Sequence, residues 1–276
     1  MENFQYILPE IFISVSIMLF LLVGVFKKNS ASLIYNLSNI SLVILLALII
    51  NLSSLDTIYL FNESYLIDNL SNYMKIILVG SGIFVMLTGS KYIQVINLNK
   101  IEYPILILSS ILGMMIMISS NDLIVFYMGL ELQSLALYVL ASFNRDNLLS
   151  TESGLKYFVL SALSSGLLLY GCSLTYGFSE STNFDQILIN STEFNYGTTF
   201  GIVFILVGLA FKISAVPFHM WAPDVYQGSP TSVTLFFAIL PKIAALSVFI
   251  KFLYTPFANM NDQWQTIIVF ISIASM

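Results

Sequence analysis

The chain has 276 residues, of which 58% are hydrophobic and only 9% are charged, and its formal net charge is −5. Soluble domains carry about 25% charged residues, so this chain could not cover its own surface in water, and we expect a lipid bilayer to be its solvent. The acidic balance excludes a basic surface for nucleic acid. One cysteine, Cys172, and one histidine, His219, exclude a disulfide framework, a thiolate cluster and a multi-histidine metal or haem site.

The apolar runs predict an all-α polytopic membrane protein with eight complete spans, because a membrane helix needs about 20 mostly apolar residues. We expect the spans near 7–26, 31–51, 73–95, 103–120, 121–141, 153–176, 200–220 and 230–253. A ninth run begins near residue 264 and stops at Met276, too early to cross, which predicts that the sequence is an N-terminal fragment cut inside a helix. The opening MENFQYILPE lacks a basic segment and holds two acids, so the first run is expected to be retained rather than cleaved.

The charges of the loops predict the orientation, because short loops rich in Lys and Arg stay on the cytoplasmic or matrix side. Basic residues follow spans one, three and five: Lys27, Lys28, Lys91, Lys100 and Arg145. The acids of the other loops are Asp56, Glu63, Asp68, Glu180, Asp185 and Glu193. We therefore expect the N-terminus outside, with Lys75, at the outer edge of span three, as an exception.

Ionisable residues inside the spans carry the functional information, since each costs roughly 2.5–3.5 kcal/mol or more at mid-bilayer. Glu131, Lys212 and Lys242 are central in spans five, seven and eight, and Lys156 lies near the inner end of span six. Lys156 could also reach the interface along its apolar stem, as we expect for Lys251.

The central residues suit proton transfer, because a lysine in a low-dielectric site loses its proton more easily and a nearby carboxylate reverses that effect. Glu131 and Lys212 are thus predicted to approach each other as a coupled switch, and Lys242 to receive the proton and pass it on. The alternative is a structural ion pair between Glu131 and Lys212, although buried pairs contribute little net stability.

Two prolines and the histidine accompany the lysines. Pro217 follows Lys212 by five residues and is predicted to break span seven, and Pro241 is expected to loosen span eight beside Lys242. Broken helices are tolerated at membrane depth where protein or a wet cavity satisfies the backbone, and they mark ion sites in transporters. His219 would lie two turns beyond Lys212 if the helix continued. It is either a proton relay or a hydrogen-bonded histidine at the inner membrane edge.

Three stretches resemble the chain N family of respiratory complex I, the proton-translocating NADH:quinone oxidoreductase. They are the opening ILPEIFISVSIMLF, residues 128–171 (MGLELQSLALYVLASFNRDNLLSTESGLKYFVLSALSSGLLLYG) and residues 208–234 (GLAFKISAVPFHMWAPDVYQGSPTSVT). All antiporter-like subunits, including chains L and M and the multi-subunit sodium/proton antiporters, share the broader pattern of a Glu, a Lys before a proline-broken helix and PD…PT…LPK. The form PDVYQGSPTSVT is typical of chain N.

The resemblance implies the antiporter-like subunit fold, with N-terminal helices 1–3 over 1–102, a first five-helix repeat (helices 4–8) over 103–253 and the start of a truncated second half over 254–276. It assigns proton translocation to Glu131, Lys156, Lys212 and Lys242.

It also implies partners and a location. The partners would be chain M and small membrane subunits, in a bacterial inner or mitochondrial inner membrane. NADH, FMN, iron–sulfur clusters and quinone would bind in other subunits, and no cofactor or metal on this chain. The rival functions are a sodium/proton antiporter subunit without redox coupling and a structural membrane spacer.

Overall fold

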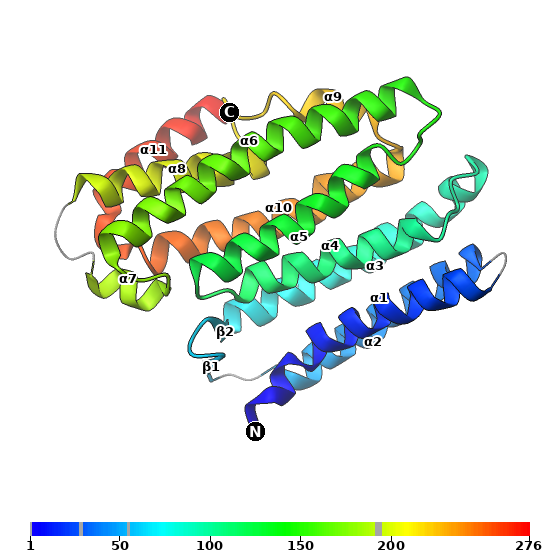
Figure 1. The fold of residues 1–276 in the computed structure, drawn as a ribbon, viewed down its shortest axis with the longest axis horizontal. Helices are drawn as coiled ribbons and strands as arrows, with labels where there is room; N and C mark the ends of the chain where they lie inside the picture. The colour runs from blue at the N-terminus through cyan, green and yellow to red at the C-terminus, as the bar shows by residue number, and fades with distance from the viewer. Residues whose placement is uncertain (1, 28–29, 54–55, 191–194) are drawn as a thin grey trace.

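A computed structural model describes residues 2–27, 30–53, 56–190 and 195–276, a bundle of long helices (Figure 1). Lys28 and Glu193, which entered the predicted orientation, lie outside the described residues. The long helices are α1 (Leu8–Phe26), α2 (Ala31–Leu52), α3 (Asn69–Val95), α4 (Glu102–Ser119), α5 (Leu123–Ala141), α6 (Leu148–Ser179), α8 (Tyr196–Ile213), α10 (Thr231–Tyr254) and α11 (Asn261–Ser275). Shorter elements are η1 (Glu2–Ile7), β1 (Ile58–Leu60), β2 (Tyr65–Ile67), α7 (Phe184–Asn190), α9 (Ala222–Gly228) and η2 (Ala258–Met260).

Within these ranges, eight helices are long and apolar enough to cross a membrane, which confirms the predicted number of complete spans. Two predicted boundaries were wrong. The sixth span was expected over 153–176 but is the 32-residue helix α6, because Asn147 caps its start by accepting a hydrogen bond from the Leu149 amide. The seventh was expected over 200–220 but ends at Ile213. The division into 1–102, 103–253 and 254–276 stays a prediction.

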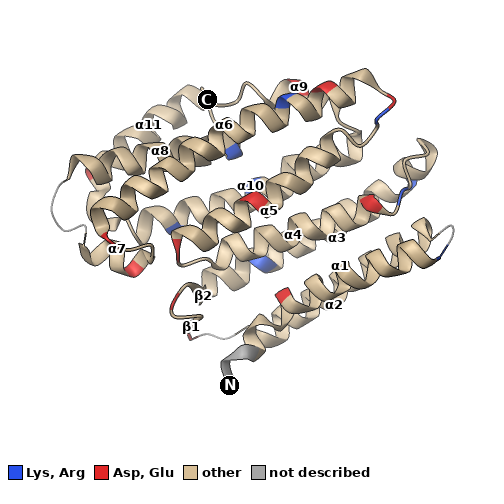
Figure 2. Cartoon of the chain, in the orientation of Figure 1, with Lys and Arg blue, Asp and Glu red and all other residues tan. Residues whose placement is uncertain are grey.

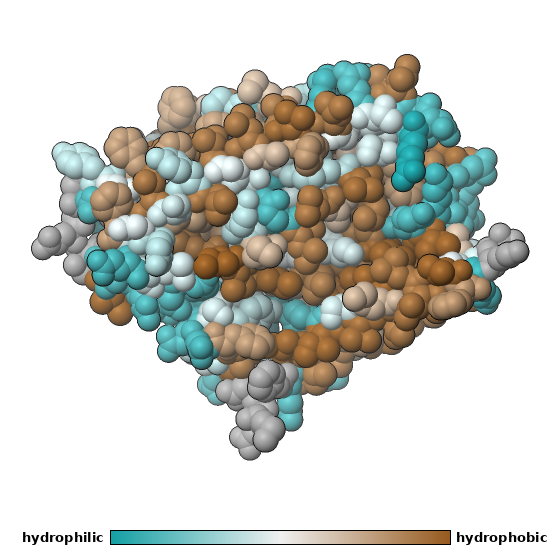
Figure 3. Space-filling model, in the orientation of Figure 1, coloured by the Kyte–Doolittle hydropathy of each residue, from teal (hydrophilic) through white to brown (hydrophobic). Residues whose placement is uncertain are grey.

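Small residues let the central helices approach closely. A Cβ built on Gly113 of α4 would lie 2.6 Å from the Gln133 amide nitrogen of α5, and one on Gly129 would lie 2.8 Å from the Met117 nitrogen. Such contacts are typical of membrane helices, where dispersion between backbones replaces the hydrophobic effect. The face shown in Figure 3 carries many apolar side chains across its middle, and large apolar residues of the outer helices are exposed, as a lipid-facing surface requires.

A polar cap closes one end of the bundle, around a hairpin that the sequence did not predict. Strands β1 and β2 pair antiparallel, and Tyr65 forms a further bridge with Ser120. The side-chain amides of Asn121 and Asn183 both donate to the Glu63 carbonyl, at 3.0 and 3.1 Å. The cap therefore ties the hairpin to the loops beside α5 and α7.

The loop charges separate along the bundle (Figure 2). The Lys and Arg residues of the loops lie at the end opposite the hairpin, whereas the hairpin end carries acidic loops. This separation agrees with the predicted division of loops into two sides. The side on which the N-terminus lies stays a prediction.

Candidate functional site

The broken helix α8 ends in the middle of the bundle and positions the site. Ser214 takes a left-handed conformation (φ 60°, ψ 40°), and the Ala215 amide donates to the Ala210 carbonyl at 2.9 Å, which closes the helix. The predicted break in span seven is thus confirmed. The helix ends four residues before Pro217, because the left-handed turn at Ser214 already turns the chain out of the helix.

His219 lies beyond the break, in the turns between α8 and α9, and its side chain is exposed. A helix continuing through 220 would have placed it on the face of Lys212, and that placement was wrong. The relay role of His219 stays a prediction.

Lys212 is the buried charge at the centre of the bundle, with 5% of its surface exposed. Its ammonium donates to Ser134 Oγ of α5 at 2.8 Å and to Ser161 Oγ of α6 at 2.7 Å. The Tyr138 hydroxyl donates to the same Ser161 oxygen at 2.7 Å. Three helices thus converge on one ammonium group through neutral hydroxyls.

Glu131 lies on α5, one turn before Ser134, and is half-buried. Its charge acts on Lys212, but within the described residues no ion pair joins the two. Its Oε1 atom is buried and has no hydrogen-bond partner in that part of the chain. The geometry therefore differs from the structural ion pair considered as the alternative, and the switch role of Glu131 stays a prediction.

Lys242 of α10 caps the broken end of α8. Its Nζ atom donates to the Lys212 carbonyl at 3.1 Å and to Ser214 Oγ at 2.7 Å, and lies 5.0 Å from the centre of the Trp221 ring. A cation is favoured there, because the last carbonyls of a helix are unpaired and carry partial negative charge. Helix α10 runs through Pro241 without a break, unlike α8, and the expected loosening of span eight beside Lys242 stays a prediction.

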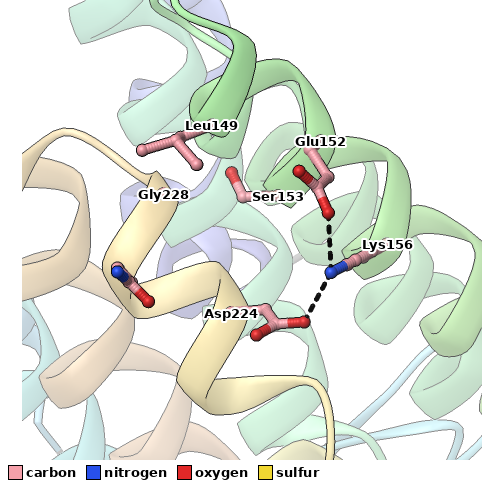
Figure 4. Close-up of a pocket in the computed structure, with 7 residues that line it drawn as sticks. Leu149, Glu152, Ser153, Lys156, Asp224 and Gly228 are labelled. Carbon is pink, nitrogen blue, oxygen red and sulfur yellow. Dashed lines mark hydrogen bonds and ion pairs between the residues drawn. The ribbon is translucent and has the colours of Figure 1, made fainter.

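Lys156 lies apart from this centre, between α6 and α9. It pairs with Glu152 at 2.8 Å and with Asp224 of α9 at 2.7 Å (Figure 4). Its side chain is 41% exposed, and the three charges line a small cavity of about 60 Å³. The sequence analysis included Asp224 in the PD pair of the family pattern but predicted no role for it.

Two other lysines differ from their predicted surroundings. Lys251 was expected to reach the membrane interface, but it is 6% exposed and donates to the Ile118 carbonyl at 3.4 Å. Lys75 was placed at the outer edge of span three, but it is buried and pairs with Glu10 of α1 at 2.6 Å. The sequence gave no signal for this pair, because 65 residues separate its members.

Metal binding has no support in the described residues. No group of three or more His, Cys, Asp and Glu side chains there could hold a metal ion. The residues of the candidate site that the sequence analysis did not name are Ser134, Ser161, Tyr138 and Asp224. The spacing of Ser134 from Glu131, one helical turn on the same face, was the available signal for the first of them.

Comparisons with known proteins identify the family of the chain. Residues 120–276 match the family described as NADH:quinone oxidoreductase/Mrp antiporter, TM. The chain is 69% identical to NADH-quinone oxidoreductase subunit N of Pelagibacter ubique (strain HTCC1062), over all of this chain and 59% of that protein. It is 50% identical to subunit N of Rhodospirillum rubrum, over 98% of this chain and 56% of that protein. The chain thus spans less than three fifths of the length of these two relatives.

The fold is found in solved complexes. A chain of respiratory complex I from Thermus thermophilus superposes with a TM-score of 0.76 at 27% identity, covering 88% of this chain and 52% of that one. A chain of the Mrp complex from Dietzia sp. superposes at 0.77 with 18% identity, covering 93% and 50%, which shows a shared fold alone. On the family match over more than half of its residues, this chain belongs to the membrane subunits of the NADH:quinone oxidoreductase/Mrp antiporter family.

Proposed function

We propose that this chain is the N-terminal part of subunit N of a proton-translocating NADH:quinone oxidoreductase, and that its buried lysines move protons across the membrane. The observation that carries the proposal is the contact between the two lysines. Lys242 donates to the carbonyl of Lys212 itself, and within the described residues the Lys212 ammonium donates to hydroxyl groups alone. A charged group at membrane depth with neutral partners is expected to have a function, since it contributes little as structural glue.

In this proposal, Lys212 alternates between ammonium and amine. Two of its three N–H donors bind the oxygens of Ser134 and Ser161. The Ser161 hydroxyl can turn its proton toward a neutral amine, whereas the Ser134 hydroxyl donates to the Leu130 carbonyl and accepts from either form of the lysine. The negative charge of Glu131 favours the ammonium, so loss or movement of that charge releases the proton. The proton passes through hydroxyls or water to the Lys242 amine at the end of α8, where unpaired carbonyls favour a cation.

Lys156, Glu152 and Asp224 are the proposed uptake site. They lie at the basic end of the bundle, around a partly exposed cavity, and Lys156 precedes Ser161 by five residues on α6. Five residues of helix span about 7.5 Å, so a proton captured there would travel a short way to the hydroxyl beside Lys212. Exposed carboxylates near an ion-paired lysine collect protons from water without a large desolvation cost.

Redox chemistry is proposed for other subunits. NADH, FMN, iron–sulfur clusters and quinone would bind there, and this chain would contact a neighbouring antiporter-like subunit, chain M, and small membrane subunits. The subunit N relatives support this assignment, with identities of 69% and 50% over nearly the whole chain.

The test is NADH-driven proton uptake in inverted membrane vesicles that carry the full-length subunit, with complex content measured in parallel. We expect uptake in the wild type, and strong loss with both Lys242→Ala and Lys242→Arg, because arginine stays protonated and cannot release the proton. Uptake that follows a sodium gradient and ignores NADH would instead identify a sodium/proton antiporter. Normal uptake with arginine, together with lost assembly with alanine, would favour a structural role for Lys242.

A further inference from the structure

A second buried ion cluster lies at the hairpin end of the bundle, away from the central lysines. Glu10 of α1 and Lys75 of α3 form the tightest ion pair among the described residues, with side chains 8% and 4% exposed. The Tyr65 hydroxyl of β2 donates to Glu10 Oε1 at 2.8 Å, and Lys75 Nζ donates to the same oxygen at 2.6 Å. Three elements far apart in the sequence thus meet at one carboxylate oxygen.

The other carboxylate oxygen is left without a partner. Glu10 Oε2 is buried and has no hydrogen bond within the described residues. Glu10 also lines a cavity of about 360 Å³, together with Ser64, Tyr65 and the apolar Ile7, Ile116 and Val125. A static ion pair would leave this charged oxygen unsolvated, which is costly, whereas a proton on Oε2 removes the charge.

We propose that Glu10, Tyr65 and Lys75 form a second proton-binding site, which exchanges its proton with water at the hairpin end of the bundle. This inference rests on the proposed function in proton transfer and extends it. The ligand is a proton delivered and removed by water, and the carboxyl group of Glu10 is the group that carries it.

The transfer balances within the cluster. A proton moves from the Lys75 ammonium to the Glu10 carboxylate across the 2.6 Å contact, which leaves a neutral amine and a neutral carboxyl group. The proton arrives on Oε1, the oxygen that contacts Lys75. A half turn of the carboxyl group about its Cγ–Cδ bond exchanges the places of the two oxygens, and the protonated oxygen then releases the proton to a water molecule in the cavity, giving hydronium and restoring the carboxylate. The Lys75 amine then accepts the next proton. Tyr65 stays a neutral donor throughout, because burial and the nearby Glu10 charge raise the pKa of its hydroxyl well above the ordinary value.

Lys251 connects this cluster to the central site. It follows Lys242 by nine residues on α10, about 14 Å along the helix axis. Its Nζ atom binds the Ile118 carbonyl at the end of α4, and the charges of Asp68, Lys75 and Asp185 act on it.

Polar atoms without partners lie near this connection. The next residue after Ile118, Ser119, has a buried Oγ without a partner in the described part of the chain, and so does Asn72 Nδ2, one turn before Lys75 on α3. Buried polar atoms of this kind are where proteins hold ordered water, and such water would link Lys251 to Lys75. Protons that reach Lys242 would therefore pass through Lys251 to this cluster and leave to water at the hairpin end of the bundle.

The competing explanation is a clamp that only joins α1 to α3, and charge-free variants separate the two. The experiment uses the assembled complex with the full-length subunit in membrane vesicles, and compares Glu10→Gln, Lys75→Met and the double variant, with Glu63→Gln as the matched control at an exposed carboxylate of the same end. We expect Glu10→Gln and the double variant to lower NADH-driven proton uptake roughly tenfold or more, as for loss of a positioned acid. The double variant should keep wild-type complex content, and Glu63→Gln should leave uptake unchanged.

Infrared difference spectra between resting and NADH-reduced complex give a second readout. We expect a protonated-carboxyl band in the wild type that Glu10→Gln removes and Glu63→Gln retains. Wild-type uptake in the double variant, or spectra without a Glu10-dependent band, would overturn the proposal and leave a clamp. Absence of NADH-driven uptake in the wild type would instead overturn the proposed function, so the two failures are distinguishable.

Discussion

Lys212 and Lys75 are both buried in the bundle, but they are held in opposite ways. Lys212 is bound by the hydroxyls of Ser134 and Ser161, and the nearest acidic influence on it, Glu131, makes no direct ion pair among the described residues. Lys75 is in direct contact with Glu10. A lysine bound by hydroxyls can lose its proton without leaving an unpaired carboxylate charge in the protein interior. A lysine in a buried ion pair would leave such a charge unless it gave its proton to the carboxylate itself. The comparison separates two routes of proton release, directly from the lysine at the centre and through the carboxylate partner Glu10 at the hairpin end.

The largest effect is expected from giving Lys212 a carboxylate partner, which removes its difference from Lys75. Ser134→Asp would place one where the hydroxyl now accepts at 2.8 Å, and would hold the ammonium as Lys75 is held. We expect NADH-driven proton uptake to fall by a factor of about 100, the lower end of what a positioned acid or base contributes. Ser134→Asn, which is similar in size but neutral, is the control for assembly. Near-normal uptake with the aspartate would contradict the need for neutral partners.

Removing the charge of Glu131 tests the opposite change, in which Lys212 loses the negative charge that acts on it. Glu131→Gln keeps the shape and takes away the negative charge that acts on Lys212. We expect complex content close to wild type and proton uptake roughly tenfold lower, because the lysine then lacks the group that favours its charged form. The measurement is uptake and NADH oxidation in vesicles with the full-length subunit. Wild-type values for both would exclude the switch role.

A smaller effect is expected from one hydroxyl. Ser161→Ala removes an acceptor of Lys212 that also joins Tyr138, while Ser134 still accepts from the ammonium. Uptake should fall several-fold, with the complex still assembled. Ser179→Ala is the matched control at the far end of the same helix, since its buried hydroxyl donates to the Thr175 and Ser181 carbonyls. Equal losses from the two variants would assign the effect to packing of α6.

The smallest effect is expected at the uptake site. Asp224→Asn removes one of two carboxylates paired with the partly exposed Lys156, and such pairs contribute about 0–1 kcal/mol. Proton uptake should fall by less than about fivefold. The deficit should be largest at low salt, where exposed charges act most strongly. Asp146→Asn, an exposed acid in the loop before α6, is the control. A loss as large as that of Ser134→Asp would place Asp224 in the central path.

The sequence predicted the parts of the site that depend on composition along one helix. The positions of Glu131, Lys212 and Lys242 were predicted from their depth in apolar runs. The break was predicted from Pro217, although the helix ends four residues earlier, at Ile213. The partners of Lys242 could not be predicted, since one is a backbone carbonyl freed by the break and the other, Ser214, needs the left-handed turn to face it.

The incorrect or missing predictions concern side chains whose surroundings are set by tertiary packing. Lys251 is only three residues from the end of α10, which normally lets a lysine reach the interface. It is buried instead because the end of α4 lies against it, and its ammonium binds the Ile118 carbonyl. The Glu10–Lys75 pair and the three-residue strands that support Tyr65 are also contacts between distant segments, so local pattern carries no information about them.

The central claim is that Lys212 works by alternating between charged and neutral forms. Lys212→Arg keeps the positive charge and the donors but fixes the protonated form, whereas Lys212→Met removes the charge. The deciding measurement is NADH-driven proton uptake in vesicles with the full-length subunit, normalised to complex content. We predict that uptake is lost with both variants, although the complex assembles with arginine. Wild-type uptake with Lys212→Arg would contradict the account, because a permanently charged residue would then suffice.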